Sequence, residues 1–223
     1  MTKFVKSIAL AALMAGASTG ASAAIVVNGG FESGLGAGNG WKVTYVTGTT
    51  PGNGIKAVTT NGVADSTGYG DVVSAYQGTG SKAAFFVDDN AIQSLSQFVS
   101  LAANTKYTLS FGLFATNSGE QNPFDFGLTD TVGFNLLGIQ TSVGSSLVAG
   151  AWKTYNYTFT SGSAGNYLLN FGFVSGATPA KDVLLDGVSI TAVPEPSTWA
   201  MMIGGLGLVG VAMRRRKSTV SFA

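Results

Sequence analysis

The sequence contains no histidine and no cysteine among its 223 residues. Ser-His-Asp and Cys-His catalytic triads, thiolate nucleophiles, disulfide bonds and the usual zinc sites are therefore excluded. Charge is scarce as well, since Asp, Glu, Lys and Arg together make up 10% of the chain. Only carboxylates, hydroxyls, amides, a few lysines and aromatic rings remain for the chemistry of a site.

Arginine is absent from the whole middle of the chain, because all three arginines lie at Arg214–Arg216. The stretch from Ala24 to Glu195 contains six lysines and all eleven acidic residues, which gives it a net charge of −5. An acidic surface without arginine repels phosphate backbones, so we expect no nucleic-acid partner.

The first 23 residues have the parts of a secretory signal peptide. Lys3 and Lys6 supply positive charge, Ile8–Ala15 forms a short apolar run, and Ala21-Ser22-Ala23 provides small residues for a signal peptidase. The apolar run is too short for a transmembrane helix. We therefore predict a signal peptide over residues 1–23, with Ala21 and Ala23 at the cleavage site, and export of the rest.

The C-terminal end combines a Pro-Glu-Pro tripeptide, an apolar run and a basic tail. Its parts are, in order, Pro194-Glu195-Pro196, Trp199-Ala200, the Gly-rich run up to Met213, and Arg214-Arg215-Arg216-Lys217. The two prolines favour an extended, accessible peptide. The 15 residues from Trp199 to Met213 would span about 22 Å as a helix, against about 30 Å of bilayer hydrocarbon. The tryptophan at one interface and snorkelling arginines at the other favour a single membrane span with the basic tail in the cytoplasm.

This segment resembles the PEP-CTERM sorting signal of exopolysaccharide-producing Gram-negative bacteria, in its variant with Trp-Ala after the Pro-Glu-Pro. The resemblance covers residues 193–217. It implies that an exosortase-type membrane protease cuts near the Pro-Glu-Pro and releases the protein or transfers it to the cell surface. A plain C-terminal anchor that is never cut is the alternative.

Between the two ends, residues 24–192 show a hydrophobic period of 2, which predicts β-strands. The clearest alternation lies in Tyr107–Leu113, Tyr155–Phe159 and Tyr167–Phe173. Shorter runs predict further strands at Ile25–Val27, Val43–Val46, Ala83–Val87, Val132–Leu137 and Val183–Ile190. Turn residues cluster between these runs, and no long helical stripe occurs outside the two ends. We therefore predict one all-β domain with a sandwich architecture.

The order of several short motifs in this domain is distinctive. It opens with Asn28-Gly29-Gly30-Phe31-Glu32 and Trp41, continues with Gln97-Phe98-Val99 and with Trp152 before Tyr155–Phe159, and closes with Leu184-Leu185-Asp186-Gly187-Val188-Ser189-Ile190. This order resembles the jelly-roll carbohydrate-binding modules and their galactose-binding-like relatives. The resemblance implies a jelly-roll β-sandwich and a polysaccharide ligand.

In such modules the opening Glu and an acid of the last strand often hold a structural Ca²⁺ together with backbone carbonyls, because this hard cation takes several oxygen ligands. The matching residues are Glu32 and Asp186, whereas Gly187 stands where many relatives carry a second acid or Asn. The alternative is that Glu32 faces solvent or caps a turn and that Asp186 pairs with a backbone amide.

Other polar and aromatic candidates have simpler explanations. The run Asp88-Asp89-Asn90 lacks the spacing of an EF-hand and favours a turn. The acids Glu120, Asp125 and Asp130 lie in a loop-rich segment and are the candidates for a glycosidase acid/base pair. Aromatic residues near Gly-rich loops are the candidates for a sugar platform, namely Trp41, Tyr45, Tyr69 and Tyr76.

We therefore predict a non-catalytic protein of the cell surface or extracellular space, exported across the inner membrane, which associates with exopolysaccharide or biofilm matrix. Its expected partners are a signal peptidase, an exosortase-type protease, a polysaccharide and, before processing, the membrane. A structural Ca²⁺ is the one cofactor considered. Two alternatives remain, a secreted carboxylate-dependent glycoside hydrolase or lyase and a purely structural surface protein.

Overall fold

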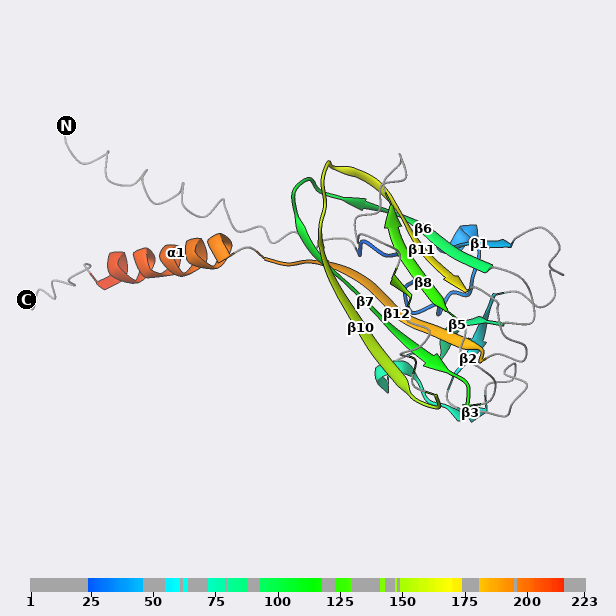
Figure 1. Ribbon diagram of the computed structural model, residues 1–223. Coiled ribbons are helices and arrows are strands. Elements are labelled where there is room, and N and C mark those ends of the chain that lie inside the picture. Colours follow the sequence, from blue (N-terminus) through cyan, green and yellow to red (C-terminus); the bar gives the residue numbers. More distant parts are fainter. Residues whose placement is uncertain are drawn as a thin grey trace, which may run out of the picture.

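The computed structural model describes residues 24–45, 55–60, 62–63, 72–78, 80–87, 93–117, 123–129, 141–142, 147, 149–173, 181–194 and 196–214. Ten of the described strands form two five-stranded sheets that face each other (Figure 1). Every strand pair in the two sheets is antiparallel. The predicted all-β sandwich is thus confirmed.

The first sheet, here called sheet I, has the strand order β1-β6-β11-β8-β9. Its strands are β1 (Lys42–Tyr45), β6 (Gln93–Leu101), β11 (Gly165–Phe173), β8 (Phe124–Thr129) and β9 (Thr141–Ser142). Sheet II has the order β10-β7-β12-β5-β2. Its strands are β10 (Trp152–Thr160), β7 (Lys106–Ala115), β12 (Val183–Ala192), β5 (Lys82–Phe86) and β2 (Lys56–Thr59).

Aromatic rings fill the space between the two sheets. Phe111 of β7 lies 5.1 Å, between ring centroids, from both Phe126 of β8 and Phe171 of β11. Trp41, which is fully buried, packs against Phe31 at 5.3 Å. Such buried rings contribute a large share of the apolar area that stabilises a sandwich.

A second, smaller apolar cluster lies on the outer face of sheet II. It consists of Val58, Val73, Ala83, Phe85, Val87, Phe114 and Leu184, with Trp152 packed against it. The chain that covers this face includes the short pair β3 (Gly62–Val63) and β4 (Val72–Val73) and a 3₁₀ turn at Tyr76–Gly78. Much of the outer face of sheet II is therefore closed to ligands.

The strand predicted at Ile25–Val27 is wrong, because this opening segment forms bends and turns. The side chain of Gln97 takes the place of a neighbouring strand. Its Oε1 accepts the N–H of Val27 at 2.7 Å, and its Nε2 donates to the carbonyls of Val27 at 2.9 Å and Gly40 at 3.0 Å. One buried amide thus pairs the backbone groups that a ladder would have paired. The short 3₁₀ turn Ala37–Asn39 follows before β1.

The chain leaves the sandwich at the end of β12 and enters helix α1 (Pro196–Arg214), which projects away from the domain (Figure 1). The presence of a helix after the Pro-Glu-Pro is thus confirmed, whereas its membrane span stays a prediction. Within residues 24–214, as far as these are described, no helix meets the combined length and hydropathy expected of a membrane-crossing helix.

Candidate functional site: an open groove and a carboxylate cavity

Strand β6 contributes small polar side chains and one aromatic ring to the outer face of sheet I. Leu95, Val99 and Leu101 point into the core, so the residues that alternate with them point outward. These outward residues are Ser94, Ser96, Phe98 and Ser100. Phe98 stands out because the residue is 68% exposed although it lies in the middle of the strand.

The register of the neighbouring strands extends this outer face sideways. Ser96 pairs with Lys42 of β1 on one side and with Asn170 of β11 on the other, and Phe98 pairs with Leu168. Together they line a groove of about 380 Å³, which also includes Gly40, Trp41, Thr44, Ser94 and Gln97. The groove thus combines a small apolar patch, formed by Phe98 and Leu168, with a row of hydroxyl and amide groups.

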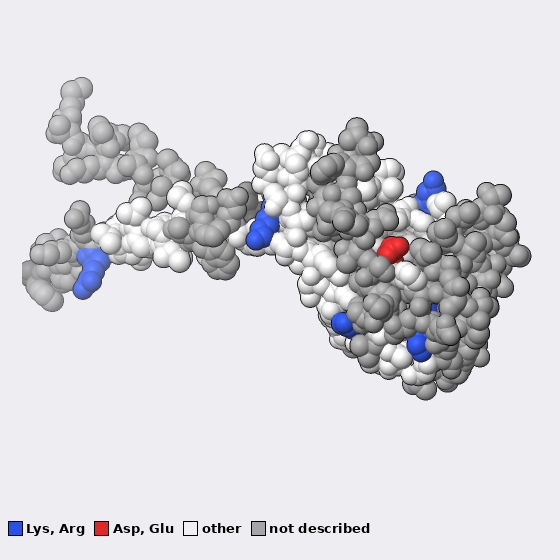
Figure 2. Space-filling model, in the orientation of Figure 1, with Lys and Arg blue, Asp and Glu red and all other residues white. Residues whose placement is uncertain are grey.

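The groove carries one charged side chain, that of Lys42. Its hydroxyls and amides donate and accept hydrogen bonds, and one of them, Ser94 Oγ, already donates to Asn170 Oδ1. The described charged residues stand apart from one another on the face shown in Figure 2 and form no basic patch there. Chemically, the groove suits a neutral or weakly anionic polyhydroxylated ligand that offers one apolar face.

A second cavity, of about 290 Å³, lies on the other sheet and brings Glu32 and Asp186 together. The Glu32 carboxylate accepts the backbone N–H groups of Ser81 at 2.7 Å and Lys82 at 2.9 Å, and the Ser81 hydroxyl at 3.0 Å. Burial works to raise the pKa of Glu32, but these hydrogen bonds and the charge of Lys82 outweigh it, so its pKa is lowered.

Asp186 has the opposite character. It is 4% exposed, and its Oδ1 accepts the backbone N–H of Gly187 at 2.6 Å. Burial raises the pKa of Asp186 to about 7, the Gly187 hydrogen bond works against this, and the charge of Glu32 adds to it. A buried carboxyl that faces a second carboxylate is stabilised in its charged form by a cation.

Gly187, beside Asp186, is at a bulge where β12 shifts register against β7 between Asp186 and Ser189. Its φ is +62°, and a Cβ atom here would lie 2.3 Å from Tyr76 Cε1. The backbone conformation and the Tyr76 ring therefore both require glycine.

The cavity offers the oxygen donors that a hard cation takes. Gly30, Glu32, Gly80 and Asp186 line it, so two carboxyl-bearing residues and two glycines border the same hollow. No group of three or more acidic residues gathers among the residues described. A complete ligand set therefore depends on main-chain carbonyls and water, which is compatible with Ca²⁺ and unsuited to softer metals.

The structure corrects several of the predicted site residues. Asp125 lies in strand β8, not in a loop, and shares the outer face of sheet I. Trp41 and Tyr76 are buried at 0% and 5% exposure, so neither is a sugar platform. Among the described residues the exposed ring is that of Phe98, which the sequence placed in the motif Gln97-Phe98-Val99 but not among the sugar-platform candidates, although the alternation with Leu95 and Val99 points it outward.

Other predicted residues lie outside the described residues. These are Ala21, Ala23, Tyr69, Asp88-Asp89-Asn90, Glu120, Asp130, the run Val132–Leu137, Glu195 and Arg215-Arg216-Lys217, together with the side chains of Tyr45, Trp199 and Ala200. The predicted pair of Glu120 or Asp130 with Asp125 thus remains a prediction.

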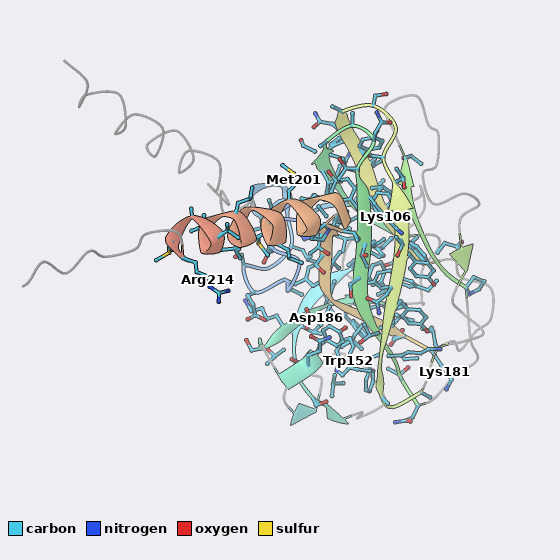
Figure 3. The ribbon with its side chains drawn as sticks, turned by 90° about the vertical axis from the view of Figure 1, so that its left-hand side faces the viewer. Lys106, Trp152, Lys181, Asp186, Met201 and Arg214 are labelled. Carbon is cyan, nitrogen blue, oxygen red and sulfur yellow. The ribbon has the colours of Figure 1, made fainter. Side chains whose placement is uncertain are left out.

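The sorting segment follows the sandwich without a spacer. The Val193 N–H donates to the Lys106 carbonyl at 2.8 Å, Pro194 is exposed, and α1 begins at Pro196. The helix exposes Met201, Ile203, Leu206 and Leu208 to solvent, each by more than half, and Arg214 is in its last turn (Figure 3).

Comparison with known proteins gives a sequence motif for the C-terminal segment and a fold for the sandwich. Residues 192–217 match the PEP-CTERM protein-sorting motif. No curated protein is similar enough in sequence to count as a relative.

Solved structures share the fold of the sandwich. A carbohydrate-binding module, TmCBM61 in complex with β-1,4-galactotriose, is 18% identical with a TM-score of 0.54, over 77% of this chain and 100% of that chain. The enzymatically active domain of tailspike protein 4 of bacteriophage CBA120 is 15% identical with a TM-score of 0.50, over 76% of this chain and 21% of that chain. The domain is thus a jelly-roll sandwich of the kind found in carbohydrate-binding modules.

Proposed function

We propose that this protein is exported, is sorted by an exosortase-type protease, and binds exopolysaccharide or biofilm matrix at the cell surface or outside the cell. The binding site is the groove on the outer face of sheet I. The observation that carries this proposal is the exposed ring of Phe98 beside Leu168, in a strand otherwise lined by small polar side chains. The ring lies outside the core and beside Leu168, so both are available to pack against the apolar face of a ligand.

The groove matches the two faces of a sugar ring. The C–H face of a pyranose packs against Phe98 and Leu168, and its hydroxyl edge meets the polar groups of Ser96, Asn170 and Lys42. The outer face of sheet II offers no equivalent, because the second apolar cluster and the Tyr76 turn cover much of it.

The comparisons support a glycan as the ligand class. TmCBM61 carries β-1,4-galactotriose, and its whole length aligns with the sandwich of this chain. No step of catalysis is needed for the proposed role. The sorting motif supports export. In this proposal the chain is delivered to the outer side of the inner membrane, and α1 serves as a transient membrane anchor.

A structural Ca²⁺ between Glu32 and Asp186 is part of the proposal. When bound, it would neutralise the two carboxylates and tie the opening segment to β12. Thermal unfolding of the domain is expected at a higher temperature in calcium than in chelator, because a ligand of the folded state stabilises it. Asp186→Asn should remove that difference, and an equal midpoint in calcium and chelator for the natural domain would contradict the cation.

The groove is tested by a matched pair of asparagines on opposite faces of the sandwich. Asn170 lines the groove, whereas Asn156 is exposed on the outer face of β10 in sheet II. In affinity electrophoresis through the producing organism's own exopolysaccharide, Asn170→Ala is expected to lose about tenfold in affinity, and Asn156→Ala to retain it.

Phe98→Ala should abolish retardation in the same gel. It should leave the unfolding midpoint nearly unchanged, because the ring is exposed in the folded domain. If Asn170→Ala, Asn156→Ala, Phe98→Ala and the natural domain were all retarded equally, the groove would not be the binding site.

A further inference from the structure

One row of residues across the groove consists of hydrogen-bond donors. Ser96 of β6 pairs with Lys42 of β1 on one side and with Asn170 of β11 on the other. The three strands are neighbours in sheet I (Figure 1), and neighbouring strands lie about 4.8 Å apart. An ammonium group, a hydroxyl and an amide thus lie side by side in the groove, and we call these three residues the donor row.

Ser96 has a hydroxyl that the protein itself does not use. The residue is only 7% exposed, yet it borders the groove. Within the part of the chain that the structure describes, its hydroxyl makes no hydrogen bond. Few water molecules can reach a hydroxyl that is this enclosed, so it gains more from a fixed acceptor than an exposed hydroxyl would. The natural place for such an acceptor is the groove.

Lys42 gives the donor row its positive charge. Its side chain is exposed on β1 and makes no ion pair with any described residue. The described acid on the same outer face is Asp125 of β8, three strands away from β1. That separation of about 14 Å exceeds the Debye length of about 8 Å at physiological ionic strength. Asp125 therefore leaves the charge of Lys42 available to a ligand.

Asn170 contributes its amide nitrogen. Its Oδ1 already accepts the Ser94 hydroxyl at 2.5 Å, whereas its Nδ2 makes no hydrogen bond within the described residues. The amide N–H groups therefore remain for a ligand, and the part of Asn170 that is already bonded is its acceptor.

The donor row lies next to the apolar patch of the groove. Phe98 and Leu168 pair with each other two residues further along the strands than Ser96 and Asn170, which is about 7 Å. A sugar ring that packs on Phe98 therefore carries its substituents toward the donor row. In a uronic acid one of these substituents is a carboxylate that is bonded directly to the ring.

We propose, on the basis of the polysaccharide-binding function proposed above, that the groove selects an acidic glycan and that Lys42, Ser96 and Asn170 bind its carboxylate. A carboxylate only accepts hydrogen bonds and has about four sites for them, so it can pair with all three donors at once. Its hydrogen bonds are charge-assisted and stronger than those of a sugar hydroxyl. A neutral sugar would leave the charge of Lys42 without a counterpart.

The test uses the full chain, purified in a mild detergent, in affinity electrophoresis through the producing organism's own exopolysaccharide. One gel contains the untreated polymer, and the other contains the same polymer after carbodiimide activation and borohydride reduction of its carboxyl groups to alcohols. The natural chain is expected to bind the untreated polymer about tenfold more tightly than the reduced one.

Lys42→Gln is expected to weaken binding to the untreated polymer about fivefold and to leave binding to the reduced polymer unchanged. Lys42→Arg should keep the preference, and so should Lys106→Gln, the matched control at an exposed lysine of sheet II. Ser96→Ala should also weaken binding to the untreated polymer about fivefold. Its unfolding midpoint should stay the same or rise, because the hydroxyl has no partner among the described residues.

Equal binding of the natural chain to both polymers would overturn the inference and leave a groove for neutral glycans. A preference that survives in Lys42→Gln would also overturn it, since the carboxylate would then be bound elsewhere. If the natural chain were retarded by neither polymer, the polysaccharide-binding function itself would fail.

Discussion

Tyr76 shows at the residue scale how one side chain closes a face of the sandwich. Its ring spans Gly112 of β7 and Gly187 of β12, and a Cβ atom at either glycine would lie 2.3 Å from a ring carbon. Its hydroxyl shares a hydrogen bond with Thr154 Oγ1 at 2.7 Å. The sequence placed Tyr76 among the sugar-platform candidates, because nothing in a local pattern reveals two glycines that are distant in the chain.

Gly112→Ala is therefore expected to destabilise the domain by about 1–3 kcal/mol, because the new methyl group must displace the Tyr76 ring. Gly162→Ala is the matched control, since a Cβ at Gly162 meets nothing within 4 Å. Urea denaturation of both variants measures the difference. Equal midpoints would show that the ring does not pack on Gly112.

Asp186 makes the stability of the calcium-free domain depend on pH. Its pKa is raised from 3.8 to about 7 in the folded protein, so the folded state binds a proton that the unfolded state has released between these values. The stabilisation is therefore fully present below the lower value and is lost as the pH rises through the higher one.

In chelator, the free energy of unfolding is expected to fall by up to about 3 kcal/mol between about pH 5 and about pH 8. Asp186→Asn removes the titrating group and should flatten this dependence. Urea unfolding at the two pH values checks it. A natural domain with a flat profile, or a variant with the same slope, would contradict the burial of this carboxyl.

At the scale of elements, alternation predicted three of the long strands well but did not predict β6, which has nine residues. The runs Tyr107–Leu113, Tyr155–Phe159 and Tyr167–Phe173 became β7, β10 and β11. Strand β8 was missed, although Phe124–Thr129 alternates, because its outward Asp125 and Gly127 made the segment resemble a loop. The pairs β3, β4 and β9 have two residues each, too few to show a period.

The opening segment failed as a strand prediction because a side chain, not a backbone, pairs with it. Gln97→Leu should leave the N–H and carbonyl of Val27 unpaired and cost about 2–4 kcal/mol. Ser100→Ala, an exposed position on the same strand, should cost less than about 0.5 kcal/mol. Thermal unfolding of both variants tests this, and a neutral Gln97→Leu would show that the amide does not hold the segment.

At the scale of the whole molecule, the sequence predicted the sandwich and the sorting motif but not which face is open. That depends on chain between β2 and β5 folding over sheet II, which places Val73 and Tyr76 on it. Once this part of sheet II is covered, sheet I presents the groove that carries the exposed Phe98 ring. The ligand face is thus a result of tertiary packing, which local pattern cannot show.

The most direct test of the central claim is a calorimetric titration of the purified Ala24–Val193 domain with the producing organism's own exopolysaccharide, in calcium and in chelator. The account predicts saturable binding in calcium, weaker in chelator if the cation holds the opening segment in place. The absence of heat and of saturation in both conditions would contradict a polysaccharide-binding role and leave a sorted structural surface protein.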